Sequence, residues 1–239
     1  MKNCATRNLF NFLILAILWQ LVFIPLIGCD RQEKTPAEAE KIIIPEYKGT
    51  IIAVGDSLTA GQGVAENDAW PALLGKKLHK NGYEWQVINA GISGETSSGV
   101  LSRVKWILAQ KPEIVILETG ANDGLRGIPT PVIRENIGKA VQMLGEGNVT
   151  VVLAGMQIVR NLGDEYTGNF AGIYPAVAER QKVLLIPFIL QDVAGEPSLN
   201  QADTIHPNEM GHKKVADIVF PYVLQAIKEH AERKTADDV

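Results

Sequence analysis

Apolar positions along this chain fall into short continuous runs, separated by longer stretches with helical spacing. The runs contain mainly Val, Ile and Leu, which is typical of strands buried on both faces of a parallel sheet. The pattern therefore predicts five strands, at residues 51–54, 86–89, 114–118, 149–154 and 183–187.

Between these runs, apolar residues recur every three or four positions, as on one face of a helix. Three such stretches lie at residues 100–108, 133–144 and 215–227, and the second follows Thr130 and Pro131, a residue suited to the first helical position. Strands alternating with helices predict a three-layer α/β/α domain with a parallel sheet. We place this domain at residues 48–230 and expect a charged C-terminal tail at residues 231–239.

The N-terminus has the pattern of an export signal. Lys2 and Arg7 precede a largely apolar run that ends at Cys29, and this junction resembles a bacterial lipobox. We expect residues 1–28 to be a lipoprotein signal peptide, Cys29 to carry the lipid, and residues 29–47 to form a tether. An uncleaved transmembrane anchor is the alternative, because about 20 apolar residues can span a bilayer. Asp30 resembles the signal that retains lipoproteins at the periplasmic face of the inner membrane.

Composition excludes several classes of function. The formal net charge is −4, so the chain has no electrostatic reason to bind nucleic acid. The two cysteines, Cys4 and Cys29, both precede the predicted domain, which therefore contains no disulfide, thiolate metal site or cysteine nucleophile.

Polar and glycine-rich segments follow the predicted strands. Ligands of a parallel sheet bind at the carboxyl ends of its strands, where such segments meet. We therefore expect four segments to converge on one edge of the sheet, at residues 55–57, 90–94, 119–123 and 203–207.

Together these segments supply the groups that acyl transfer needs. Ser57 follows a strand and offers a hydroxyl nucleophile, and His206 offers a base that Asp203, three residues upstream, can orient. The backbone N–H groups of Ser57 and Gly91 and the amide of Asn122 are candidate oxyanion donors. Taken singly, each has an ordinary explanation: Ser57 as a helix cap, Asp203 as a turn cap.

The same residues resemble the four sequence blocks of the SGNH/GDSL hydrolases. The blocks are Gly-Asp-Ser-Leu at 55–58, Gly91 within Asn-Ala-Gly-Ile-Ser-Gly, Gly-Ala-Asn-Asp at 120–123, and Asp-Thr-Ile-His-Pro-Asn at 203–208. Further matches at 69–74, 91–97, 120–127 and 173–175 are similar to the bacterial arylesterase, lysophospholipase and thioesterase I branch.

The resemblance implies a flavodoxin-like five-stranded sheet and hydrolysis of carboxylic esters or thioesters through an acyl-enzyme, with no metal and no cofactor. It assigns Ser57 as nucleophile, Asp203 and His206 as its triad partners, and Gly91 and Asn122 to the oxyanion hole. We expect a monomer that takes acyl substrates. Glu95 and Ala121 are two small departures from the branch pattern.

Residues 157–172 depart more from the branch pattern. The matching stretch in the branch borders the acyl pocket, which implies the same place for these residues. Their apolar Leu162, Tyr166 and Phe170 stand four residues apart, and three glycines accompany them. We expect these three side chains to line a mobile wall of the pocket. The alternative is a short amphipathic helix packed on the core.

Three other functions remain as rivals. One is a carbohydrate O-acetyl esterase of the cell envelope, which the closer branch match disfavours. Another is a non-catalytic binding module, although none of Ser57, Asn122, Asp203 and His206 has been lost. The third, a flavin- or nucleotide-binding flavodoxin-like protein, lacks a phosphate-binding glycine loop after the first strand.

Overall fold

A parallel five-stranded sheet forms the centre of the domain in a computed structural model that describes residues 46–237. The strand order is β2-β1-β3-β4-β5, and every neighbouring pair runs parallel. The strands are β1 (Gly49–Gly55), β2 (Trp85–Gly91), β3 (Ile114–Glu118), β4 (Thr150–Ala154) and β5 (Leu184–Ile186).

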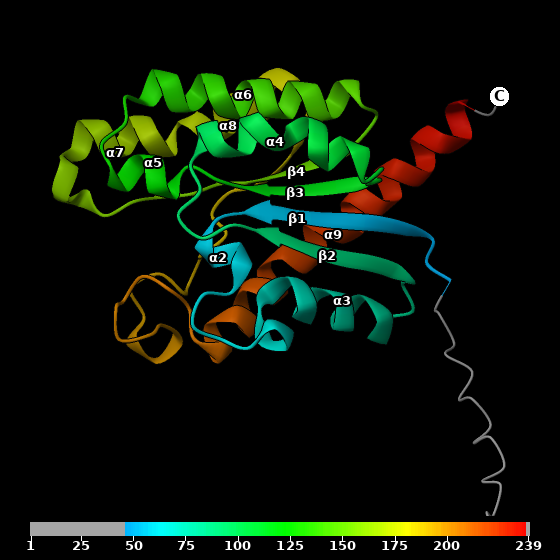
Figure 1. The fold of residues 1–239 in the computed structure, drawn as a ribbon, viewed down its shortest axis with the longest axis horizontal. Coiled ribbons are helices and arrows are strands. Elements are labelled where there is room, and N and C mark those ends of the chain that lie inside the picture. Colours follow the sequence, from blue (N-terminus) through cyan, green and yellow to red (C-terminus); the bar gives the residue numbers. More distant parts are fainter. Residues whose placement is uncertain (1–45, 238–239) are drawn as a thin grey trace, which may run out of the picture. The chain divides into compact units, whose positions relative to one another are not determined.

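Helices cover both faces of the sheet, as Figure 1 shows. Helices α3 and α9 lie on one face and pack against each other, whereas α4, α6 and α8 lie on the opposite face. Short helices α2 and α5 stand at the carboxyl ends of β1 and β3. The helices are α2 (Ser57–Ala60), α3 (Trp70–Lys80), α4 (Ser97–Ala109), α5 (Ala121–Leu125), α6 (Thr130–Glu146), α7 (Asp164–Ala171), α8 (Ile173–Gln181) and α9 (Glu209–Asp237), with single 3₁₀ turns η1 (Glu66–Asp68), η2 (Arg160–Leu162) and η3 (Pro197–Leu199).

The sequence pattern explains this arrangement. Central strands β3 and β4 are buried along their whole length, because helices cover both faces and leave no side for polar residues. Helix α6 buries only its apolar stripe, which comprises Ile133, Ile137, Ala140, Val141 and Leu144. The result is one continuous core between sheet and helices.

All five predicted strands are present, and the three-layer α/β/α prediction is confirmed. The predicted tail is wrong as far as Asp237, because α9 continues to that residue. Arg233, within the expected tail, donates a hydrogen bond from its guanidinium to the Thr150 hydroxyl on β4. This contact anchors the last turns of the helix to the sheet, so these residues belong to the fold.

The predicted signal peptide, Cys29 and residues 29–45 of the predicted tether lie outside the described residues. Among residues 46–237, no helix has both the length and the apolar character required to cross a bilayer.

Candidate active site

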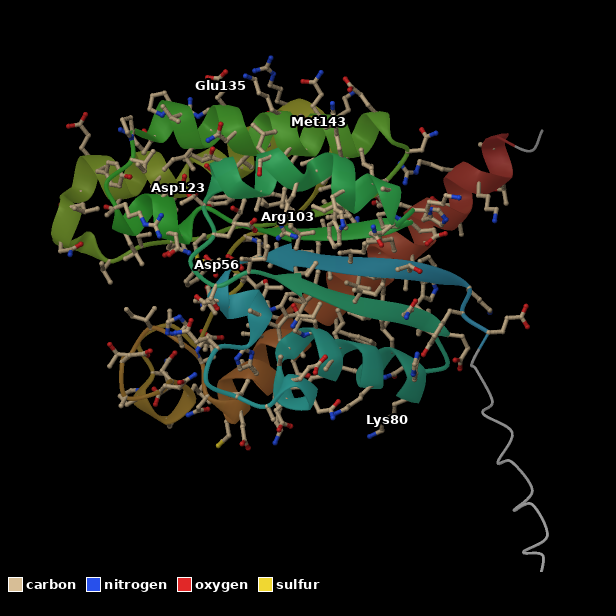
Figure 2. The ribbon with its side chains drawn as sticks, viewed as in Figure 1. Asp56, Lys80, Arg103, Asp123, Glu135 and Met143 are labelled. Carbon is tan, nitrogen blue, oxygen red and sulfur yellow. The ribbon has the colours of Figure 1, made fainter. Side chains whose placement is uncertain are left out.

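Ser57 lies at the carboxyl edge of the sheet, immediately after β1. It is the first residue of α2, and Asp56 caps this helix by accepting a hydrogen bond from the Leu58 N–H over 2.9 Å. Figure 2 shows Asp56 near the arrowhead of β1, on the side where the strands end. The Ser57 hydroxyl is therefore held between a buried strand and a capped helical turn.

His206 meets Ser57 from a loop far along the chain. Its Nε2 lies 2.9 Å from Ser57 Oγ, and its Nδ1 lies 2.7 Å from Asp203 Oδ2. Asp203 Oδ1 also accepts hydrogen bonds from the backbone N–H groups of Ile205 and His206, each over 3.0 Å. The three residues expected to act together are brought into one continuous chain of hydrogen bonds.

The ionisation of Asp203 fixes the tautomer of His206. Hydrogen bonds from the His206 backbone and ring, and then from the Ile205 backbone, lower the pKa of Asp203 to about 2. A carboxylate only accepts hydrogen bonds, so the proton facing it must reside on Nδ1. In the neutral ring Nε2 then has a free lone pair, and it can accept the Ser57 proton.

Gln201 joins the His206 loop to the loop after Ser57, a role the sequence did not reveal. Its backbone N–H donates to the His206 carbonyl, and its side-chain amide donates to the carbonyls of Pro207 and of Gln62, which follows α2. Base and nucleophile are thereby tied together by a contact that does not involve either reacting atom.

Gly91 lies against the Ser57 helix, and only glycine fits there. A Cβ on Gly91 would lie 2.2 Å from the backbone nitrogen of Ala60 in α2. The Gly91 N–H donates a hydrogen bond to Asn89 Oδ1 over 2.9 Å. This expected oxyanion donor thus has an acceptor within the chain.

Asn122, the expected side-chain donor, is the second residue of α5 and is held from two sides. Its Nδ2 donates to Asp56 Oδ2 and to the Glu95 carbonyl, each over 3.0 Å. The two hydrogens of one amide are therefore directed toward acceptors on the Ser57 turn and on the β2–α4 loop. These bonds fix the amide orientation before any substrate arrives.

Two buried carboxyl groups lie behind Ser57. Asp56 and Glu118 are both almost inaccessible to solvent. Burial raises the pKa of Asp56, and burial together with the charge of Asp56 raises the pKa of Glu118 well above its ordinary value. The sequence placed Glu118 at the end of a strand and gave it no role.

The expected acyl wall has a different structure. Residues 164–171 form α7, in which Phe170 is fully buried and packs edge-on against Tyr174. Tyr166 donates its hydroxyl to the Ile128 carbonyl, whereas Leu162 remains 41% exposed. Phe170 therefore belongs to the core and does not line an open pocket, which corrects that expectation. Leu162 is the member of the three that is open to solvent.

A surface groove of about 890 Å³ lies between α6 and α8, away from this edge of the sheet. Arg134, Gln142 and Arg180 are among its lining residues, and no member of the Ser57–His206–Asp203 chain is. Within residues 46–237 no cluster of three His, Cys, Asp or Glu side chains is arranged to hold a metal ion.

Comparisons with known proteins identify the family and the fold. The model of the GDSL-like Lipase/Acylhydrolase family matches residues 53–214. Esterase TesA of Pseudomonas aeruginosa is 39% identical over 173 residues, which cover 72% of this chain and 86% of that protein. Thioesterase 1/protease 1/lysophospholipase L1 of Escherichia coli K12 is 36% identical over 169 residues, covering 70% and 80%. The crystal structure of the psychrotrophic esterase EstA from Pseudoalteromonas sp., inhibited by monoethylphosphonate, superposes with a TM-score of 0.72 at 32% identity, covering 75% of this chain and 99% of that one.

Proposed function

Because the chain belongs to the GDSL-like Lipase/Acylhydrolase family, we propose that it hydrolyses carboxylic esters or thioesters with Ser57 as nucleophile. The observation that supports this most directly is the hydrogen-bonded chain from Ser57 Oγ through His206 to Asp203. The similar proteins are named as an esterase and as a thioesterase/lysophospholipase, and these names support the same chemistry.

In the acylation step, Ser57 Oγ attacks the carbonyl carbon while its proton moves to His206 Nε2. The carbonyl oxygen becomes an anion in a tetrahedral intermediate. That intermediate collapses by expelling the alcohol or thiol, which takes the proton from His206, and leaves an acyl group on Ser57. Water then attacks the acyl carbonyl carbon while its proton moves to His206 Nε2. Collapse of the second tetrahedral intermediate returns that proton to Ser57 Oγ and releases the carboxylic acid.

We assign the oxyanion hole to the N–H groups of Ser57 and Gly91 and to the Asn122 amide. The Gly91 and Asn122 groups already bond to acceptors within the chain. Each must therefore share a hydrogen with the anion, which accepts more strongly than the neutral carbonyl oxygens of Asn89 and Glu95 that these groups now bond to. The existing bonds have the advantage that the donors need no reorientation in the transition state.

Ser57→Ala tests the assignment. We expect the variant to fold normally and lose hydrolysis by up to about 10⁶-fold in kcat, as for nucleophile loss in a serine protease. A fluorophosphonate probe should label the wild type and not this variant. Ser102→Ala is the matched control, because Ser102 is an exposed serine on α4 that bonds only to the Gly99 carbonyl. Full activity in well-folded Ser57→Ala protein would refute the mechanism.

The preferred acyl group requires a substrate panel. We propose aryl esters, acyl thioesters and lysophospholipids as the substrate classes, as opposed to acetylated carbohydrate. Rates on p-nitrophenyl esters, acyl-CoA thioesters and lysophosphatidylcholine of graded chain length, compared with acetylated xylan, decide between them. Faster turnover of the acetylated polysaccharide than of every longer acyl substrate would favour the O-acetyl esterase instead.

We further propose that a lipid on Cys29 anchors the domain to the periplasmic face of a bacterial inner membrane. The support is the apolar run that stops at Gly28-Cys29, followed at once by charged residues. Multiple acyl chains anchor firmly, whereas one alone binds weakly. Mass spectrometry of the mature N-terminus should find acylated Cys29, and Cys29→Ser should shift the protein from the membrane fraction or leave it unprocessed. An unmodified peptide that spans Gly28 and Cys29 would support the transmembrane anchor.

A further inference from the structure

A fully buried carboxyl group, Glu118, lies behind the turn that carries Ser57 and takes no part in the steps described above. We propose that Glu118 is a positioning residue of the reaction, whose uncharged carboxyl group joins the two ends of the Ser57 turn and thereby holds Ser57 and Asn122 in reactive geometry. This inference rests on the proposed hydrolase function.

The contacts of Glu118 bracket Ser57. One carboxyl oxygen, Oε2, accepts a hydrogen bond from the Asp56 backbone N–H over 3.0 Å and another from the Thr59 hydroxyl over 2.9 Å. Asp56 precedes Ser57 and Thr59 follows it by two residues, so a single oxygen atom spans the turn. Glu118 ends β3, the middle strand of the sheet, which is buried along its length, so this oxygen is positioned by the core of the domain.

Gly55 supports the same interpretation from the other side. A Cβ on Gly55 would lie 2.4 Å from Glu118 Oε2 and 2.2 Å from Thr59 Oγ1. A residue with any side chain at position 55 would therefore displace the carboxyl group from the turn. The glycine that precedes Asp56 and Ser57 is explained by the need to admit Glu118.

The surroundings favour an uncharged Glu118. Its side chain is 0% exposed, and none of the ion pairs among the described residues includes Glu118 or Asp56. Two carboxyl groups buried together without a cation cannot both be ionised at small cost. The titratable groups that face them are Tyr174 from α8 and His206 from its loop. Burial raises the pKa of Glu118 well above the ordinary value, and the charge of Asp56 raises it further.

Asp56 links Glu118 to the expected oxyanion donor. Glu118 fixes the backbone of Asp56, and Asp56 Oδ2 accepts a hydrogen bond from Asn122 Nδ2. With one proton between the two carboxyl groups, and that proton on Glu118, Asp56 is an anion and holds the Asn122 amide strongly. A second negative charge on Glu118 would oppose both that arrangement and the anion that forms during acyl transfer.

Two substitutions at Glu118 separate geometry from charge. Glu118→Gln keeps the length and the neutral acceptor oxygen, so we expect kcat within about threefold of wild type at neutral pH. Glu118→Asp shortens the side chain by one methylene, so we expect kcat to fall by on the order of 10–10²-fold with KM nearly unchanged.

Thr59→Val removes one of the two hydrogen bonds to Glu118 at similar side-chain volume, so it should also lower kcat. It tests the same role if the Glu118→Asp protein does not fold. Glu113→Gln, at the residue just before the amino end of the same strand, is the control and should leave kcat unchanged.

Two measurements without substrate test the protonation. Infrared spectra of the wild type at neutral pH should contain the C=O stretch of a protonated carboxyl group, and Glu118→Gln should lose it. A buried neutral Glu118 binds a proton that the unfolded chain has released, so the free energy of unfolding should fall as pH rises above the ordinary glutamate pKa. The Gln variant should lack that part of the decline.

Wild-type kcat in both Glu118→Asp and Thr59→Val would overturn the positioning role. Loss of activity in a Glu118→Gln protein of wild-type melting temperature, or a wild-type infrared spectrum without the protonated carboxyl band, would overturn the uncharged state. Failure of the proposed function itself is distinguishable, because the wild type would then hydrolyse no ester or thioester and Ser57→Ala would equal it. The infrared and alkaline-stability results would still test Glu118 in that case.

Discussion

Arg103 and Glu95 form a nearly buried two-pronged ion pair across the start of α4. Arg103 Nε donates to Glu95 Oε1 over 2.7 Å, and its terminal nitrogen donates to Glu95 Oε2 over 2.6 Å and to the Ala90 carbonyl over 2.8 Å. One guanidinium thus holds both ends of the β2–α4 loop. That loop follows Gly91, the last residue of β2, and contributes the Glu95 carbonyl that accepts from Asn122.

Arg103→Met should therefore impair catalysis although Arg103 contacts no reacting atom. Methionine keeps much of the apolar stem but removes every hydrogen bond, and it leaves the Glu95 carboxylate unpaired in a partly buried site. We expect kcat for an aryl ester to fall by about 10–10²-fold, with a smaller change in KM, as measured by steady-state kinetics. Arg134→Met, on the surface of α6, is the control.

A double variant, Glu95→Gln with Arg103→Met, should lose less transition-state stabilisation than the sum of the two single losses, because the pair acts as a unit. Additive losses would mean that the two residues act separately.

Asn122→Ala should lower kcat far more than it raises KM. We assign this amide to the charge that develops in the transition state, and loss of one such donor typically costs about 10²–10³-fold. Steady-state kinetics on an aryl ester and the rate of fluorophosphonate labelling should fall together, since both form an anionic centre at Ser57. A change confined to KM would assign Asn122 to ground-state binding.

Asp203→Asn should disturb the tautomer of His206 without removing either hydrogen-bonding position. An amide can present its NH₂ to Nδ1 and so favour the wrong ring tautomer, which in a serine protease lowers kcat by about 10⁴-fold. Melting temperature should change little, because Asp203 is exposed and lies in a loop. Asp192→Asn, another exposed aspartate in a loop, is the control. An Asp203→Asn enzyme with wild-type kcat would show that His206 needs no carboxylate partner.

Leu162→Ala and Phe170→Ala should now have different effects. Leu162 is exposed after β4, so its truncation should flatten the dependence of kcat/KM on acyl length while sparing acetyl esters. Each methylene buried by a substrate contributes about 0.8 kcal/mol. Phe170 is buried against Tyr174, so its truncation should instead lower the free energy of unfolding by about 3–5 kcal/mol. Urea titration and a chain-length series measure the two effects. An unchanged length profile in Leu162→Ala would place the acyl pocket elsewhere.

His212 should make the domain sensitive to acid. The ring is buried in α9, with Nδ1 accepting a hydrogen bond from the Trp70 backbone N–H at the start of α3. Burial, and then the nearby His206, lower the pKa of His212 to about 4. The folded state therefore keeps His212 neutral while the unfolded chain protonates it near pH 6.5, so stability should decline as pH falls from about 6.5 to 4. Thermal unfolding between pH 8 and pH 4 should show a steeper acid loss in the wild type than in His212→Gln. Parallel curves would assign the acid loss to other groups.

The features predicted from sequence are those that depend on local pattern. Buried parallel strands are continuous apolar runs, so all five strands were identified. The residues of the Ser57, Asn122 and His206 segments follow strands or precede a helix, so their convergence follows from the topology of a parallel sheet.

The features that sequence did not reveal depend on contacts between distant segments. Glu118 is the polar last residue of an apolar strand, and only its hydrogen bonds to the Asp56 N–H and the Thr59 hydroxyl, about 60 residues earlier, show what it binds. Phe170 shares its four-residue spacing with Leu162, and spacing alone does not tell which side of a short helix meets the core. The charged residues after 230 suggested a tail, but α9 continues to Asp237, and Arg233 in this part of the helix bonds to the Thr150 hydroxyl.

The separation of Ser57 and His206 by 149 positions has a consequence for the order of events in synthesis. At translation rates of 5–20 residues per second, the nucleophile leaves the ribosome roughly 7–30 s before its base. During that interval the chain lacks His206, the Gln201 contact and all of α9, which packs against α3. A nascent or prematurely terminated chain therefore carries an ordinary, unactivated serine. Hydrolysis begins only when residues 201–237 have docked, so the appearance of esterase activity reports completion of the fold.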